Sequence, residues 1–295
     1  MKTPIFTGSG VALVTPFTND GIDFPKLAEL IEFHIANKTD AILICGTTGE
    51  SSTMPDSEHK EAIKFAVDTA KGRVPIIAGT GSNNTKDAIE LSKYAESVGV
   101  DGLLIVAPYY NKTTQKGLYL HTEAIAKSVK IPIILYNIPG RTGGLMFKIE
   151  TLKKLSKIPN INAIKEATGD VAFAAEIAAE TDLVIYSGND DVILPIMSIG
   201  GKGVLSVLAN IMPLETHNVC EKFLNGDIEG SKNEYLKLFK LIKTLFIEVN
   251  PIPIKTAMNL LGYDVGMLRM PLCDMEDKNL DTLKEVLVST GLKLK

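Results

Sequence analysis

A lysine inside an apolar stretch is the residue of this sequence best suited to chemistry. Lys165 lies in the run INAIKEAT, residues 161–168, whose other core positions are apolar. Burial disfavours the charged form of an amine and lowers its pKa, and a neutral amine attacks a ketone to form a Schiff base. A lone lysine in a strand more often reaches solvent at the strand end or pairs with a carboxylate such as Glu166. The other motifs therefore decide between the two interpretations.

Hydroxyl groups and one arginine stand at the ends of other apolar runs. Tyr136 closes the run before Lys165, where its phenol can exchange protons with the amine. Thr47, in the segment GTTGE, can relay a proton from Tyr136, and the Thr48 hydroxyl can hold a carboxylate. Arg141, in the loop PGRTGG, has the fork geometry that binds a second carboxylate. Each residue alone has an ordinary structural role (a packed tyrosine, a turn, a solvated arginine), so only the set favours carbonyl chemistry.

Two further strand-end segments complete the candidate set. Tyr109 and Tyr110 follow a proline, and paired exposed tyrosines more often meet a ligand or a partner chain than solvent. Gly188 lies in the segment SGND, which ends another apolar run. The four histidines lack the HExxH spacing, and the three cysteines lie far apart. We therefore expect neither a metal site nor a disulfide framework.

Eight short apolar runs, rich in β-branched residues, must position these groups. They alternate with segments of helical periodicity, which is the spacing of one βα unit per step. Continuous apolar runs predict a parallel sheet covered by helices, and closing that sheet predicts a TIM (β/α)8 barrel with its active site at the carboxyl ends of the strands. An open doubly wound sheet would carry a Gly-rich turn after its first strand, where this chain has Thr15-Pro16-Phe17. The expected strands are 10–17, 41–48, 74–81, 101–108, 131–139, 161–168, 183–190 and 203–210, with helices such as 24–37, 56–71, 85–98 and 117–129 between them.

The pattern beyond residue 210 predicts helices only. These residues exceed what the eighth barrel helix requires, so we expect a small helical C-terminal domain packed on the barrel. The barrel would span residues 1–225 and the helical domain residues 226–295. The segment Asn250-Pro251-Ile252-Pro253 is expected to form a rigid elbow. The expected helices are 214–224, 228–249, 254–261 and 279–289.

The bulk composition is that of a well-cored globular protein. Of 295 residues, 45% are hydrophobic and 22% charged, which excludes a disordered chain. A net charge of -4 and a pI near 5.7 give no general attraction to nucleic acid or to an anionic membrane. No apolar run approaches the roughly 18 residues that span a bilayer, and the start lacks a signal-peptide core. Together with the unpaired cysteines, these features predict a cytoplasmic location.

The motifs, in their order along the chain, resemble those of a known family. Over essentially the whole sequence the chain is similar to the 4-hydroxy-tetrahydrodipicolinate synthases, formerly called dihydrodipicolinate synthases. That family shares a superfamily with N-acetylneuraminate lyase and other pyruvate-dependent aldolases. The resemblance implies condensation of pyruvate with L-aspartate-4-semialdehyde in the first committed step of the diaminopimelate route to lysine, with no metal or organic cofactor. The motifs that carry it are GTTGES (46–51), GTGSN (79–83), PYYN (108–111), YNIPGRTG (136–143), IKEATGD (164–170), SGND (187–190) and NPIPIK (250–255).

The resemblance also implies catalytic roles. Lys165 would form the Schiff base, and Tyr136 would donate and accept protons. Thr47 and Tyr110 would complete a proton relay with Tyr136, with Tyr110 reaching in from a neighbouring subunit. Members of the family are commonly homotetramers built as dimers of dimers, so the resemblance implies the same assembly here.

Four positions are implied to bind substrates. Thr48 would bind the pyruvate carboxylate, Leu205 would contact pyruvate through its backbone, and Gly188 would lie against the substrates. Arg141 would hold the carboxylate of the semialdehyde. The neuraminate lyases, which act on a long sugar aldehyde, lack this arginine, so its presence favours a short acidic aldehyde.

Many members of the family are inhibited by lysine at a cleft between subunits, and two of the matching positions differ in this chain. Inhibited members carry histidine where this chain has Asp56 and glutamate where it has Asp87. The first change adds a negative charge, and the second shortens the reach of the carboxylate. We therefore expect lysine inhibition to be weak or absent. The matching positions are Ser51, Ser52, Asp56, His59, Asn83, Asp87 and Tyr109.

The sequence leaves two alternative functions open. The first is another pyruvate aldolase of the superfamily, similar to N-acetylneuraminate lyase or to a 2-keto-3-deoxy sugar acid aldolase; Arg141 argues against it. The second is a non-catalytic barrel that binds a 2-oxo acid. That function would predict loss of Lys165 or of the tyrosine relay, and this sequence keeps both.

Overall fold

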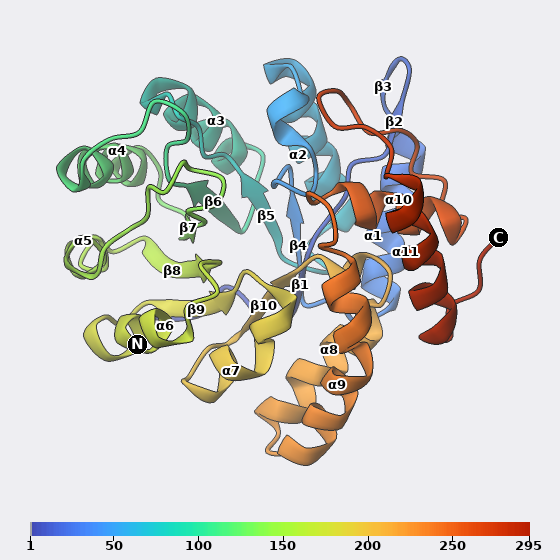
Figure 1. Ribbon diagram of the computed structural model, residues 1–295. Coiled ribbons are helices and arrows are strands. Elements are labelled where there is room, and N and C mark those ends of the chain that lie inside the picture. The colour runs from blue at the N-terminus through green and yellow to red at the C-terminus, as the bar shows by residue number, and fades with distance from the viewer. Residues whose placement is uncertain (1) are drawn as a thin grey trace.

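Eight parallel strands close into a barrel in the computed structural model, which describes residues 2–295 (Figure 1). Around the ring the order is β1-β10-β9-β8-β7-β6-β5-β4, so strands that follow one another in the barrel sequence are also neighbours in space. Seven of the eight predicted runs contain a barrel strand, the first run (10–17) overlaps β1, which begins two residues earlier, and the predicted (β/α)8 barrel is confirmed. The strands are β1 (Gly8–Ala12), β4 (Ala41–Ile44), β5 (Ile76–Gly79), β6 (Gly102–Val106), β7 (Ile133–Asn137), β8 (Ile161–Glu166), β9 (Val184–Ser187) and β10 (Gly203–Ser206).

Helices surround the barrel in Figure 1. Five of the helices begin at a side chain, Asp23, Asn84, Thr114, Asp170 or Asp227, that accepts a hydrogen bond from a backbone N–H of the first turn. Such caps satisfy the donors that a helix leaves unpaired at its start. The helices from α1 to α8 are α1 (Phe24–Ala36), α2 (Asp56–Ala70), α3 (Thr85–Ser97), α4 (Gln115–Ser128), α5 (Ile149–Leu155), α6 (Val171–Glu180), α7 (Ile193–Ser198) and α8 (Pro213–Leu224).

Side chains along each strand alternate between the barrel interior and the layer under the helices. On β8, Ala163 belongs to the interior cluster and Ile164 to the outer cluster. Lys165, two residues after Ala163, therefore faces the interior. The interior cluster contains Phe6, Ala12, Ala41, Leu43, Ile77, Leu104, Ile134, Tyr136, Ala163, Val184, Tyr186 and Leu205.

Two segments differ from the sequence-based expectation. The first predicted strand is divided: β1 ends at Ala12, and a short hairpin forms from β2 (Phe17–Thr18) and β3 (Gly21–Ile22). The helix expected over 228–249 is α9 (Ile228–Thr244), which ends five residues earlier. Pro251 disfavours helical backbone only at Asn250, so it does not by itself end α9 at Thr244. Residues 245–250 form turns that reach the carboxyl end of the barrel.

The C-terminal helices pack on one another and on one side of the barrel. Helix α9 contacts α8, and α10 (Ile252–Leu260) contacts α11 (Asp277–Ser289) and the short 3-10 helix η3 (Leu208–Asn210). One apolar cluster extends from the barrel into these helices, so the division between residues 225 and 226 stays a prediction. Among residues 2–295, no helix is long and apolar enough to cross a membrane.

Candidate active site

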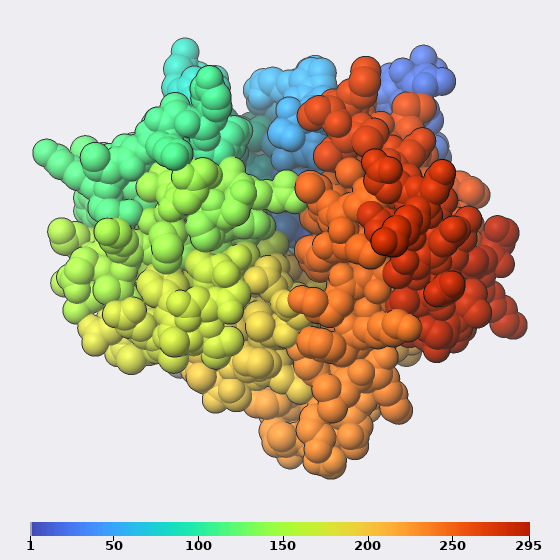
Figure 2. Space-filling view, viewed as in Figure 1, coloured from blue at the N-terminus to red at the C-terminus, as the bar shows by residue number. Residues whose placement is uncertain are grey.

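A cavity of about 610 Å³ opens at the carboxyl ends of the strands. Figure 2 shows a hollow between the green and yellow barrel segments and the orange C-terminal segment. The barrel contributes strand ends, and the turns after α9 contribute the opposite wall. The lining residues are Ala12, Thr47, Thr48, Tyr136, Ile138, Gly140, Arg141, Lys165, Gly188, Asn189, Val207, Phe246, Ile247, Glu248, Val249 and Asn250.

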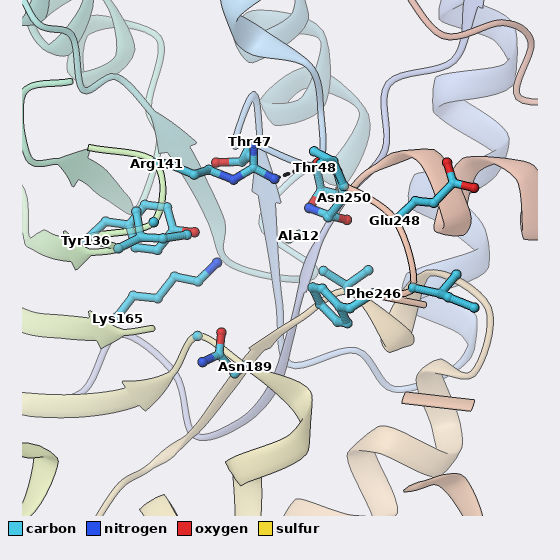
Figure 3. A pocket seen from close by; sticks show the side chains of 16 residues that line it. Ala12, Thr47, Thr48, Tyr136, Arg141, Lys165, Asn189, Phe246, Glu248 and Asn250 are labelled. Carbon is cyan, nitrogen blue, oxygen red and sulfur yellow. Dashed lines mark hydrogen bonds between the residues drawn. The ribbon is translucent and has the colours of Figure 1, made fainter. Parts of the chain in front are cut away.

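Lys165 and Tyr136 meet in this cavity because their strands are paired in register. Tyr136 on β7 lies directly opposite Lys165 on β8. The Lys165 Nζ lies 4.6 Å from the centroid of the Tyr136 ring, and the two residues are only 5% and 6% exposed. Figure 3 shows the lysine extending into the cavity next to the tyrosine ring. The amine thus lies against the ring of a tyrosine at the wall of the cavity.

The pKa values of these two groups are shifted in the directions that Schiff-base chemistry needs. Burial lowers the pKa of Lys165 to about 8; the Asp190 carboxyl opposes this shift and the Arg141 guanidinium adds to it. About a tenth of the amine is therefore neutral and nucleophilic at pH 7, far more than for an exposed lysine. Burial raises the pKa of Tyr136 to about 12, against the effects of Arg141 and of a hydrogen bond with Thr47. The phenol stays protonated and can act as an acid.

A second buried lysine, Lys255, differs from Lys165 in its surroundings. Lys255 is also buried, but its Nζ lies 2.7 Å from Glu50 Oε1 in an ion pair whose side chains are almost fully enclosed. Burial lowers the pKa of Lys255 as well, against the effect of the Glu50 carboxylate, but the contact with Glu50 occupies its amine. Lys165 has no such ion pair among residues 2–295 and, unlike Lys255, lines the cavity. Lys165 is therefore a desolvated amine, as in the first interpretation, and is not paired with Glu166.

Glu166 instead fixes the backbone around the lysine. Its Oε2 accepts a hydrogen bond from Asn137 Nδ2 at 2.9 Å, and its Oε1 accepts one from the backbone N–H of Thr168 at 2.6 Å. Asp190 has a similar role at the next strands, where its Oδ2 accepts from the backbone N–H groups of Val207 and Leu208, both at 3.0 Å. Both carboxylates hold strand ends in place under the cavity.

Asn250 is a functional residue that the sequence reasoning did not single out. Its Nδ2 donates to Thr48 Oγ1 at 3.0 Å, and its carbonyl oxygen accepts from Arg141 Nη2 at 2.6 Å. Because the Thr48 oxygen already accepts this bond, its own proton is free to be donated to a carboxylate. Figure 3 shows the Asn250 side chain next to Thr48 and Arg141. In the sequence, this position was marked only by the NPIPIK motif and by the expected rigid elbow at residues 250–253.

Gly188 lines the cavity at a point where a side chain does not fit. A Cβ atom there would lie 2.6 Å from the Ala167 Cβ and 3.0 Å from the Glu166 carbonyl oxygen. The Gly188 N–H donates to that same carbonyl at 2.7 Å. Only the carbonyl oxygen of Gly188 is therefore left to accept a hydrogen bond from an occupant of the cavity.

Two predicted site residues do not line the cavity. Tyr110 is 92% exposed and has a left-handed backbone, with a φ of 64°. Leu205 has a fully buried side chain in the barrel interior, and Val207, two residues later, faces the cavity instead. The expected roles of Tyr110 in a relay and of the Leu205 backbone stay predictions.

A second cavity, of about 540 Å³, lies beside the first and brings six of the seven predicted lysine-site residues together. Thr47, Arg141 and Asn250 line both cavities. Asn83 does not line it, although its carbonyl oxygen accepts a hydrogen bond from Asn111. The six residues are Ser51, Ser52, Asp56, His59, Asp87 and Tyr109.

The comparisons with known proteins agree with this geometry. Residues 5–290 match the model of the dihydrodipicolinate synthetase family. A 4-hydroxy-tetrahydrodipicolinate synthase from Caldicellulosiruptor saccharolyticus is 58% identical over 294 residues, covering 99% of this chain and 99% of that protein.

Solved structures of the same kind superpose closely on this chain. The dihydrodipicolinate synthase of Aquifex aeolicus has a TM-score of 0.96 and 47% identity, covering 98% of this chain and 100% of that one. A dihydrodipicolinate synthase from Cyanidioschyzon merolae, solved with lysine bound, has a TM-score of 0.95 and 39% identity, covering 99% of this chain and 100% of that one.

Proposed function

The chain belongs to the dihydrodipicolinate synthetase family, and we propose that it condenses pyruvate with L-aspartate-4-semialdehyde through a Schiff base on Lys165. The product is 4-hydroxy-tetrahydrodipicolinate, formed in the first committed step of lysine synthesis by the diaminopimelate pathway. The observation that carries the residue assignment is the buried Lys165 amine beside Tyr136 in a cavity that also contains Arg141.

The geometry supports a sequence of proton transfers around one amine. Neutral Lys165 attacks the C2 carbonyl of pyruvate, and loss of water gives the imine. Tyr136 supplies and removes the protons, with the Thr47 side chain as its neighbour at the cavity. The Thr48 hydroxyl, which accepts from Asn250, donates to the pyruvate carboxylate. Loss of a C3 proton then gives an enamine, whose carbon attacks the aldehyde.

The ring of the product requires the amino group of the aldehyde to replace Lys165 at C2. This exchange releases the lysine as a free amine, so one water molecule is lost overall and no oxidant or reductant is consumed. The chemistry needs only an amine, proton carriers and carboxylate binders, all of which line the cavity.

Arg141 is expected to select the aldehyde. Replacing it with alanine should lower kcat/KM for aspartate-4-semialdehyde by about 10- to 100-fold, because a hydrogen bond to a charged group contributes about 1.5–3 kcal/mol and about 1.4 kcal/mol is tenfold. The measurement is turnover coupled to the NAD(P)H-dependent reductase that follows, with N-acetylmannosamine as the rival aldehyde. The wild type should turn over only the semialdehyde.

Pyruvate trapping by borohydride is the control for this experiment. It needs no aldehyde, so the Arg141→Ala protein should still be trapped. Turnover of N-acetylmannosamine by the wild type, with none of the semialdehyde, would discard the substrate and keep the Schiff base. Unchanged kcat/KM in the variant would remove Arg141 from the aldehyde site.

We propose a homotetramer, built as a dimer of dimers, in which Tyr110 enters the site of a neighbouring subunit. The exposure of its ring and its left-handed backbone support this assignment, because an unsupported side chain in such a conformation needs a partner surface. Sedimentation at micromolar concentration tests it, and a monomer with full activity would contradict it.

We also propose a cytoplasmic location. The support is the state of the cysteines, since Cys45, Cys220 and Cys273 are all unpaired, which suits a reduced compartment. Activity found outside the cytoplasmic fraction of the source cells would contradict it.

Lysine is expected to inhibit weakly. In the second cavity the Asp56 carboxylate lies 2.6 Å from Lys60 on the next turn of α2 and carries the negative charge that replaces a histidine. At about 1 mM lysine, a typical metabolite scale, turnover should stay above half of the uninhibited rate. Asp56→His is the matched variant and should strengthen inhibition. Strong inhibition of the wild type at this concentration would contradict the proposal.

A further inference from the structure

We propose that the buried Glu50–Lys255 ion pair positions the loop that carries Thr47 and Thr48, and so sets the affinity for pyruvate. The inference rests on the proposed role of these threonines. Glu50 and Lys255 do not line the Lys165 cavity, so they act through the loop.

Both oxygens of the Glu50 carboxylate are attached to the C-terminal part of the chain. Oε1 accepts from Lys255 Nζ at 2.7 Å, and Oε2 accepts from the backbone N–H of Arg269 at 2.9 Å. The side chains of Glu50 and Lys255 are 0% and 1% exposed. The carboxylate is therefore held from two sides, by α10 and by the segment that follows it.

The backbone conformation of the loop explains why the bonds to Glu50 matter for its position. Cys45 and Glu50, which flank residues 46–49, both have left-handed backbones, with φ values of 55° and 56°. The Glu50 N–H donates to the Thr47 carbonyl oxygen at 3.1 Å, which closes the turn. Residues other than glycine keep such conformations only where the surroundings hold them. The bonds from Lys255 and from the Arg269 N–H to the Glu50 carboxylate stabilise this conformation at one end of the loop.

The C-terminal segment also reaches the loop at a second point. Asn250 donates to Thr48 Oγ1 at 3.0 Å, and Lys255, five residues later, binds Glu50. Residues 250–255 therefore bind the loop at two positions, Thr48 and Glu50. Loss of either contact should let Thr48 move relative to Lys165.

Stability alone does not account for the pair. A buried ion pair is often no more stable than apolar residues of the same volume, because both charges lose their water. Lys255 Nζ also lies 4.4 Å from the centroid of the Phe17 ring, and Arg269 Cζ lies 3.8 Å from the same centroid. An apolar pair would fill this space equally well, but it would not bind the loop.

The test separates charge compensation from positioning with three variants: Glu50→Gln, Lys255→Met, and both together. Two quantities are measured, the Tm and the pyruvate concentration that gives half-maximal borohydride trapping on Lys165, read by intact mass. Each single variant buries an unpaired charge or polar group and should lower the Tm. The double variant buries no net charge, so its Tm should return to near that of the wild type. Its half-saturating pyruvate concentration should stay raised by about tenfold or more, because a displaced binding group costs affinity and rate.

Glu58→Gln is the matched control. Glu58 binds Arg269 in the same cluster, with a 2.7 Å bond to Nη2, but it does not contact the loop through Glu50. This variant should lower the Tm and leave half-saturation within about twofold of the wild type. The double variant decides the question even if a single variant fails to fold.

The outcomes are distinct. A half-saturating pyruvate concentration that returns to the wild-type value in the double variant would mean that each charge only compensates the other. That result would overturn the proposal. So would Glu50→Gln with unchanged half-saturation. Failure of the wild type to trap pyruvate at all would instead remove the proposed function.

Discussion

Replacing Lys165 with alanine is expected to abolish turnover and pyruvate trapping while the barrel still folds. The proposed reaction proceeds through a covalent bond to this amine, and among residues 2–295 the other buried lysine, Lys255, is paired with Glu50. Loss of the nucleophile should lower kcat on the order of 10⁴-fold or more, the scale seen when a covalent route is removed. Turnover is measured in the coupled assay, trapping by intact mass after borohydride, and folding by circular dichroism.

Lys165→Arg is the conservative control. It keeps a positive charge at the site, but a guanidinium cannot lose its proton in a protein and forms no Schiff base. It should therefore be as inactive as the alanine variant. Pyruvate trapped on another lysine at the wild-type rate, in either variant, would show that the assignment of Lys165 is wrong.

The pH dependence of trapping provides a check on the wild type. The pKa of Lys165 is lowered to about 8, so the neutral fraction of the amine increases as the pH rises through 8. Trapping of pyruvate should accelerate from pH 6 to about 9 and then level off. Tyr136, with a pKa raised to about 12, stays protonated over this range. A rate that keeps rising through pH 10 would indicate an ordinary exposed lysine.

Replacing Tyr136 with phenylalanine is expected to lower kcat by about 10²- to 10⁴-fold, the range that a positioned acid or base contributes. The change removes one oxygen and keeps the ring that packs beside Lys165. Pyruvate should still be trapped, but more slowly, because proton transfer limits formation and breakdown of the carbinolamine. The measurements are kcat in the coupled assay and the rate of trapping with pyruvate alone.

Tyr186→Phe is the matched control for Tyr136→Phe. Tyr186 is a buried barrel tyrosine whose hydroxyl donates to the Phe6 carbonyl oxygen at 2.7 Å and which does not line the cavity. Its loss should lower stability and leave kcat nearly unchanged. Equal losses of kcat in the two variants would mean that the Tyr136 hydroxyl acts only through packing.

The barrel and the inward position of Lys165 could be predicted from the sequence because local periodicity encodes both. Each apolar run of the barrel is a strand, and alternation along β8 places Lys165 on the same face as Ala163. Parallel strands of a barrel also end at one rim, so the strand-end residues Thr47, Tyr136 and Lys165 were expected to meet, and they line one cavity.

The second wall of the site was decided only by the tertiary structure. Asn250 contacts Thr48 and Lys255 contacts Glu50, so these bonds join positions separated by 202 and 205 residues of the chain. No periodic pattern connects positions so far apart, because such contacts depend on where the C-terminal helices pack on the barrel. The early end of α9 has the same origin, since the turns after it gain contacts at the cavity that a longer helix could not make.

The availability of individual polar atoms was likewise invisible in the sequence. The Gly188 N–H is bonded to the Glu166 carbonyl, which leaves its carbonyl oxygen, and the Thr48 oxygen accepts from Asn250 but keeps its proton for donation. The sequence therefore determined which chemical groups reach the rim of the barrel. The folded chain determined which of their protons and lone pairs are still free, because that depends on partners brought together only by packing.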